Sequence, residues 1–176
     1  REAMDAYAIE SVSRALQAIE HDSLAAEISP MEIDGASVKD DEQPGKAKVD
    51  RIPTLRPAIK SHGTITAANA SSISDGASAL VLTRESNLNG REPMARIVAH
   101  TTHSIHPSEF TLAPIGAIEK LLAKTGWSAD SVDLFEINEA FAMVTMLTMQ
   151  ALNLSHDRAN IYGGACAQGH PIRSTG

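Results

Sequence analysis

Strand-like and helix-like segments alternate through the second half of the chain, and this alternation limits the possible folds more than any other feature of the sequence. Short apolar runs typical of strands cover residues 96–99, 132–137 and 159–165. Helical patterns cover residues 114–125 and 140–152 between them. Alternation of this kind predicts an α/β architecture, in which helices are layered on a sheet.

The first half of the chain is less regular. Apolar residues recur every three or four positions through residues 2–20, which predicts an amphipathic helix. Residues 27–33 have the pattern of a short strand, and the polar, turn-rich residues 34–53 have the composition of a long surface loop. The apolar run at residues 79–83 predicts a buried strand. Pro93 then separates this part from the second unit, because proline interrupts a strand ladder.

Composition narrows the class of protein. The 176 residues are 43% hydrophobic and carry a formal charge of −7, which fits one globular domain or slightly more. The acidic balance and the lack of a basic cluster exclude nucleic acid as a partner, and no apolar run approaches membrane-spanning length. The single cysteine, Cys166, excludes a disulfide framework and a multi-cysteine zinc site. A reducing compartment fits this cysteine usage, so we expect a cytoplasmic location.

Asn138 is the first candidate for chemistry. It follows the expected strand at residues 132–137, and the junction between a strand and a helix is where open α/β sheets usually present ligands. It also fits the N-cap of the following helix, which is a common role for asparagine. Both interpretations stay open, because a cap that faces a cleft can also hold a water that donates to a developing oxyanion.

His170 is the second candidate. Three glycines precede it, Gly163, Gly164 and Gly169, and Pro171 follows it. Such a sequence predicts a tight, rigid turn that presents the imidazole. An imidazole in that setting suits either deprotonation of a thiol or donation to a thioester oxygen.

Two further features of the sequence resemble functional sites. His100, His103 and His106 are regularly spaced, but no carboxylate or cysteine pattern completes a ligand set, so we expect loop histidines and no metal site. Cys166 invites a nucleophilic role. It lies between two alanines at the expected end of a strand, where a free cysteine more often serves as a small buried hydrophobe.

Three motifs together resemble those of the thiolases. They are NASSISDGA at residues 69–77, NEAFA at residues 138–142 and GGACAQGHPI at residues 163–172, and their order and spacing also match. The likeness covers essentially the whole chain and is nearest to bacterial acetyl-CoA acetyltransferases. It implies a five-layered αβαβα fold of two similar halves, here incomplete.

The resemblance also implies domain boundaries. Residues 1–73 correspond to the loop domain of the family, residues 74–92 to the last strand of the N-terminal half, and residues 93–176 to the front part of the C-terminal domain. Members of the family are commonly dimers or tetramers, so we expect the full-length protein to be a homo-oligomer.

The reaction implied by the resemblance is condensation of acetyl-CoA, or thiolytic cleavage of a 3-ketoacyl-CoA. Coenzyme A thioesters are the substrates, and no cofactor is expected. By resemblance, His170 activates a nucleophilic cysteine and helps to bind the thioester oxygen, while Asn138 holds a water in an oxyanion hole.

Four further residues are expected, by resemblance, to bind substrate. Phe141 shapes the acyl pocket, and Ser71 and Ala67 lie near the pantetheine of coenzyme A. Phe110 stands where the family commonly has a methionine that contacts coenzyme A.

The departures from the family pattern lead to further expectations. The nucleophilic cysteine of a thiolase lies upstream of these motifs and the second cysteine lies downstream, and Cys166 aligns with neither. We therefore expect an internal fragment that is inactive alone and that exposes apolar faces. The alternative is a non-catalytic module that binds acyl-CoA or a partner. Arg173 replaces a glycine of the family, which predicts strain in the loop of His170.

Overall fold

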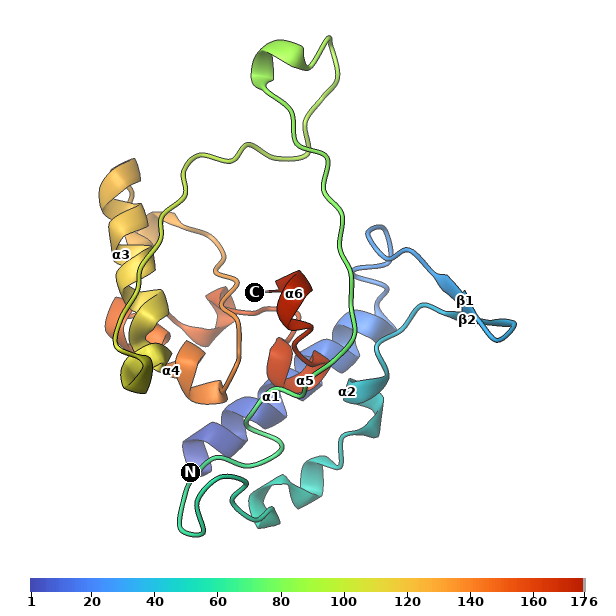
Figure 1. Ribbon diagram of the computed structural model, residues 1–176, viewed down its shortest axis with the longest axis vertical. Helices are drawn as coiled ribbons and strands as arrows, with labels where there is room; N and C mark the ends of the chain where they lie inside the picture. The colour runs from blue at the N-terminus through green and yellow to red at the C-terminus, as the bar shows by residue number, and fades with distance from the viewer. Residues whose placement is uncertain (176) are drawn as a thin grey trace.

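The computed structural model describes residues 1–175, without the side chains of Arg173 and Thr175 (Figure 1). The α-helices are α1 (Glu2–Glu20), α2 (Glu42–Lys46), α3 (Ala113–Thr125), α4 (Ala142–Leu152), α5 (Ala165–Gln168) and α6 (Ile172–Thr175). The strands are β1 (Met31–Ile33) and β2 (Ala36–Val38). Short 3₁₀ turns are η1 (Val49–Thr54), η2 (Glu85–Asn87), η3 (Pro107–Leu112), η4 (Ala129–Ser131) and η5 (His156–Arg158).

Helix α1 lies at the centre of the packing. Its buried side chains, which include Tyr7, Val12 and Ala15, recur at helical spacing and face α4 and α5. The helix spans Glu2–Glu20, as its apolar periodicity predicts. It ends where Asp22 takes a positive φ of 51°. Because α1 contacts segments from both ends of the chain, it joins them into one core.

The segment after α1 differs from its prediction. Only the last three residues of the expected strand at 27–33 pair, as β1, with β2 in an antiparallel hairpin. Asp34 and Gly35 link the two strands with positive φ angles of 51° and 79°, as a tight two-residue hairpin turn requires. The expected loop at residues 34–53 is wrong in part, because it contains β2, α2 and most of η1.

A long arch replaces two expected strands. Residues 79–83 and 96–99 do not form regular strands, and the chain between them extends far from the rest of the molecule (Figure 1). Val81 is fully exposed, Leu80 is 86% exposed and Leu82 is 72% exposed. The prediction of a buried strand at 79–83 is therefore wrong for this chain. An apolar run can pair as a strand only where a neighbouring strand supplies hydrogen bonds, and periodicity does not reveal whether one is present.

The second half contains its two expected helices. Helix α3 starts at Ala113 and is closed by Gly126, which takes the left-handed conformation with a φ of 73°. The expected strands at 132–137 and 159–165 are reduced to one parallel bridge, between Phe135 and Ala159. Within the described residues, the only regular sheet is the hairpin of β1 and β2. The described helices include none that is both long and apolar enough to span a bilayer.

Candidate active site

The three motifs found in the sequence meet in space. Residues 69–73 form an extended strip that lies between the other two motifs. Ala70 of this strip makes an antiparallel bridge with Phe141, and Ile73 makes a parallel bridge with His170. The strip therefore holds the Asn-Glu-Ala-Phe turn and the Gly-His-Pro turn at a fixed separation, although many residues lie between them in the sequence.

Asn138 and His170 lie in direct contact. The side-chain amide nitrogen Nδ2 of Asn138 is 3.2 Å from Nδ1 of His170, and both side chains are half-buried. The amide nitrogen of asparagine is a donor, and an imidazole nitrogen donates or accepts according to the tautomer of the ring. Helix α4 begins only at Ala142, with Phe141 as its N-cap. The interpretation of Asn138 as the helix cap is therefore wrong.

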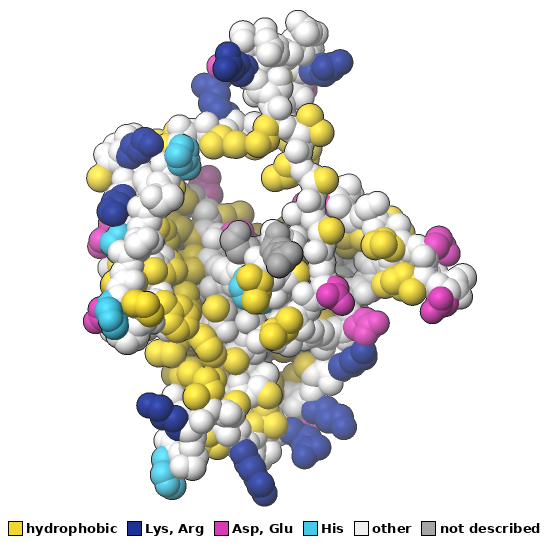
Figure 2. All heavy atoms as spheres, viewed as in Figure 1, with side chains coloured by type: hydrophobic (Ala, Val, Ile, Leu, Met, Phe, Trp, Pro, Cys, Tyr) yellow, Lys and Arg dark blue, Asp and Glu magenta, His cyan; other side chains and the backbone are white. Residues whose placement is uncertain are grey.

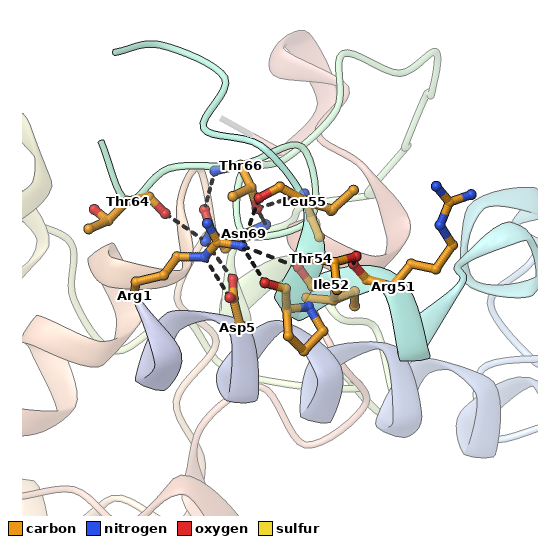
Figure 3. Close-up of polar contacts among 11 residues, drawn as sticks. Arg1, Asp5, Arg51, Ile52, Thr54, Leu55, Thr64, Thr66 and Asn69 are labelled. Carbon is orange, nitrogen blue, oxygen red and sulfur yellow. Dashed lines mark hydrogen bonds and ion pairs between the residues drawn. The ribbon is translucent and has the colours of Figure 1, made fainter. Parts of the chain in front are cut away.

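A buried asparagine anchors the strip to α1 (Figure 3). The side chain of Asn69 is fully buried, and its Nδ2 donates to Asp5 Oδ1 and to the carbonyl of Thr64, at 3.0 Å each. Its Oδ1 accepts from the backbone N–H of Thr66 at 2.8 Å. The guanidinium of Arg1 pairs with the other oxygen of Asp5. These bonds satisfy every polar atom of the Asn69 side chain and fix the start of the strip.

Glu139, next to Asn138, is the main site residue that the sequence did not reveal. Its carboxylate is 1% exposed and accepts four hydrogen bonds. The donors are the side chains of Tyr7, Ser11 and Asn160 and the backbone N–H of Cys166. One sequence signal was available, since a glutamate inside an otherwise apolar run is unusual in a core.

Cys166 lies in α5, not at the end of a strand as expected. Its thiol donates to the carbonyl of Glu139 at 3.7 Å. Burial, together with the nearby Glu139 carboxylate, raises the pKa of this thiol far above its usual range. A thiol held in its protonated form is a poor nucleophile, so the structure favours the interpretation of Cys166 as a buried packing residue.

The predicted aromatic residues also meet. The rings of Phe110, from η3, and Phe141 lie 5.9 Å apart at an angle of 58°. Ser71 lies beside them, because its N–H and its hydroxyl both donate to the carbonyl of Ala140 at 3.1 Å. The two aromatic rings form an apolar wall at the side of the candidate site.

A cleft of about 650 Å³ lies beside Cys166, which is one of its lining residues. Three cationic side chains border it, those of Lys46, Lys48 and Arg51, and small residues form much of its wall, among them Ala67 and Ala68. Its other lining residues are Val12, Glu42, Gln43, Ala47, Ile52, Leu55, Cys166 and Ala167. This combination of cations and small apolar residues suits a slender ligand that carries phosphates.

The three regularly spaced histidines do not gather around one point. His106 pairs with Ser108, and the ring of His103 lies against Gly116 of α3. In the part of the chain that the structure describes, no group of three or more His, Cys, Asp or Glu residues could hold a metal ion. The departure at Arg173 falls in the backbone of α6, and its side chain lies outside the described part.

Comparison with known proteins extends the motif likeness to the whole chain. The model of the thiolase N-terminal domain matches residues 1–86, and that of the thiolase C-terminal domain matches residues 91–176. A probable acetyl-CoA acetyltransferase from Dictyostelium discoideum is 43% identical over 183 residues, covering 100% of this chain and 44% of the relative. Other relatives are named as cytosolic, mitochondrial or peroxisomal proteins.

Solved structures give the same assignment. The acetyl-CoA acetyltransferase of Bacillus anthracis superposes with a TM-score of 0.95 at 35% identity, over 99% of this chain and 46% of that one. Human mitochondrial 3-ketoacyl-CoA thiolase in complex with CoA superposes with a TM-score of 0.90 at 33% identity, over 100% and 45%. This chain thus spans a little under half the length of the relatives that it matches. It belongs to the thiolase family and has part of the thiolase fold.

Proposed function

We propose that this chain is part of a thiolase-type acyltransferase, which condenses acetyl-CoA or cleaves a 3-ketoacyl-CoA by thiolysis. The observation that carries the proposal is the contact of 3.2 Å between the Asn138 amide and the His170 ring. The sequence motifs predict this pair as a base and an oxyanion element. The names of the relatives, acetyl-CoA acetyltransferase and 3-ketoacyl-CoA thiolase, support the same reaction class.

The proposed roles follow from the chemistry of the two side chains. His170 accepts the proton of an attacking thiol, whose sulfur forms the new bond to the thioester carbon. The bond from that carbon to the sulfur of coenzyme A then breaks, and the leaving thiolate takes the proton back from His170. A water held by Asn138 donates to the oxygen of that thioester as negative charge develops on it. Phe110 and Phe141 form the wall of the acyl pocket. These groups polarise and deprotonate, but none of them attacks the substrate.

The cleft beside Cys166 is the proposed site for coenzyme A. The phosphates of coenzyme A would face Lys48 and Arg51, because Lys46 is paired with Glu42. The narrow pantetheine would pass Ala67, where a larger side chain would obstruct it. The alanines of this wall therefore have a steric role, whereas the cations contribute charge.

We further propose that the chain alone has no thiolase activity. Its single cysteine, Cys166, is kept protonated by burial and by Glu139. The second candidate function, a non-catalytic module that binds acyl-CoA, would need only the cleft. The two candidates differ in whether His170 and Asn138 act on a thioester once a nucleophile is supplied.

We also propose domain boundaries, an assembly and a location for the whole protein. The domain boundaries at residues 73/74 and 92/93, a homo-oligomeric assembly and a cytoplasmic location follow from the family resemblance and from cysteine usage. The exposed apolar side chains of the arch support an assembly with further polypeptide, because surfaces of this kind mark interfaces (Figure 2).

Isothermal titration of the 176-residue chain with coenzyme A tests the proposal directly. We expect saturable binding with one site per chain, and competition by acetyl-CoA. Adenosine, which lacks both the phosphates and the pantetheine, is the control ligand and should bind far more weakly. Equal binding of adenosine and coenzyme A would contradict the assignment of the cleft.

A further inference from the structure

We infer that Glu139 is a positioning residue for this site, which holds the turn that carries Asn138 in register with the loop that carries His170. The inference rests on the proposed function, because it assigns Glu139 a role in the acyl-transfer site. Glu139 has no proposed contact with substrate. Its role is to place the neighbouring side chain, and its contacts show how.

The carboxylate connects three separate segments. On α1, the hydroxyl of Tyr7 donates to Oε1 at 2.7 Å, and the hydroxyl of Ser11 donates to Oε2 at 2.9 Å. From the loop that precedes His170, Nδ2 of Asn160 donates to Oε1 at 2.8 Å, and the N–H of Cys166 donates to Oε2 at 3.0 Å. Each oxygen thus accepts one bond from α1 and one bond from the loop.

Asn160 holds the other neighbour of Asn138 as well. Its Oδ1 accepts from the N–H of Ile137 at 2.8 Å, and its Nδ2 donates to the carbonyl of Ile137 at 2.8 Å. Asn138 therefore lies between two residues, Ile137 and Glu139, that are both bonded to the same side chain. Because both of its neighbours are bonded to Asn160, the backbone at Asn138 has little freedom to rotate.

The two glycines of the loop leave room for this carboxylate. A Cβ at Gly164 would lie 2.4 Å from Cδ of Glu139, and one at Gly163 would lie 2.4 Å from the carbonyl oxygen of Ser11. Any side chain at either position would push the loop away from Glu139 and α1. The motif has glycine at both positions because the backbone there passes too close to Glu139 and α1 to leave room for a side chain.

The four hydrogen bonds to Glu139 require a side chain at this position that only accepts hydrogen bonds. A glutamine at position 139 has one acceptor oxygen and one amide nitrogen that donates. If this nitrogen takes the place of Oε2, it faces the N–H of Cys166. If it takes the place of Oε1, it faces the amide of Asn160. Either orientation places the amide nitrogen against an N–H group that can only donate, so only a carboxylate satisfies all four bonds.

The test uses the whole chain with isotope-labelled histidine. The ring nitrogen resonances of His170 are assigned with a His170→Asn variant and are then compared in Glu139→Gln, Tyr7→Phe and the control Glu136→Gln. Glu136 is an exposed glutamate three residues earlier that makes none of these four bonds, so the control removes a nearby charge without removing a bond of the network. Titration with coenzyme A is run on every variant.

We expect Glu139→Gln to shift the Nδ1 resonance of His170, because Asn138 moves away from it, while Glu136→Gln keeps the wild-type spectrum. If Glu139→Gln does not fold, the Tyr7→Phe variant provides the test. It removes one of the four hydrogen bonds to Glu139, so it should shift the Nδ1 resonance of His170 by a smaller amount. An unchanged His170 resonance in a folded variant of the network would overturn the inference. Failure of the wild-type chain to bind coenzyme A would instead overturn the proposed function, and the comparison of resonances would still decide the role of Glu139.

Discussion

The amide nitrogen of Asn138 lies 3.2 Å from Nδ1 of His170, although the two residues are 32 positions apart in the sequence. Neither side chain extends from a helix. Two supports hold them together: the strip at residues 69–73, which bridges both turns, and the buried carboxylate of Glu139. Under the proposed function, a pair held in this way polarises a thioester and needs a nucleophile from elsewhere.

Gly164→Ala should destabilise the chain. The added methyl would lie 2.4 Å from the Glu139 carboxyl carbon, which is buried and cannot move without breaking its bonds. We expect a loss of roughly 1 to 3 kcal/mol in the free energy of unfolding, measured by urea denaturation. Gly45→Ala is the matched control, since a Cβ there meets nothing within 4 Å and Gly45 lies in α2. An equal loss in both variants would contradict this account.

His156 should make stability depend on pH. Burial, followed by the nearby Arg14, lowers the pKa of His156 below its ordinary value of 6.5, while its ring stacks on Tyr7. The unfolded chain therefore takes up this proton at a higher pH than the folded chain does, so stability falls as the pH drops below about 6.5.

Urea denaturation between pH 8 and pH 5 measures this effect. We expect His156→Phe, which keeps an aromatic ring but cannot be protonated, to show a smaller loss of stability on acidification. His62→Phe, at an exposed position, is the control and should retain the wild-type pH dependence. A His156→Phe profile identical to the wild type would show that another group is responsible.

The cations of the cleft should contribute to the affinity for coenzyme A. Arg51→Ala and Lys48→Ala each remove one charge that borders the cleft, and we expect each to weaken binding by roughly tenfold at low salt. The effect should shrink as ionic strength rises, because exposed charges are screened. Lys60→Ala removes an exposed charge that does not line the cleft, so it should leave the affinity unchanged.

The arch should cause self-association. Its side chains at Leu80, Val81 and Leu82 are 72% to 100% exposed, so they are available to another apolar surface. We expect the double variant Val81→Lys/Leu82→Lys to lower the sedimentation coefficient at micromolar concentration without lowering Tm. Thr83→Lys adds charge in the same segment without removing an apolar group, and it should have a weaker effect.

Local signals predicted the helices and the site pair, while pairing between distant segments could not be predicted. Helix α1 and helix α3 follow from apolar periodicity and from Gly126, which are properties of neighbouring residues. The expected strand at residues 79–83 has the right composition, but a strand also needs a partner, which composition does not specify. The same limit applies to residues 159–165, of which only Ala159 makes a bridge.

The candidate site was predictable where its residues belong to motifs. Asn138 and His170 were identified from their neighbours, and the structure brings them together. Glu139 could not be predicted because its contacts involve Tyr7 and Ser11, which lie more than 120 residues away in the sequence. The N-cap interpretation of Asn138 failed because the helix starts at Ala142, and helix boundaries depend on contacts that the sequence pattern does not show.

The most direct test of the central claim is thiolysis of acetoacetyl-CoA by a chimaera, in which this chain replaces the matching segment of the Bacillus anthracis acetyl-CoA acetyltransferase. The assay compares the chimaera, its His170→Ala and Asn138→Ala variants, and the chain alone. We expect an active chimaera, losses in kcat of roughly 100-fold or more in both variants, and no activity in the chain alone. Activity in the chain alone, or a chimaera that is indifferent to His170, would contradict the account.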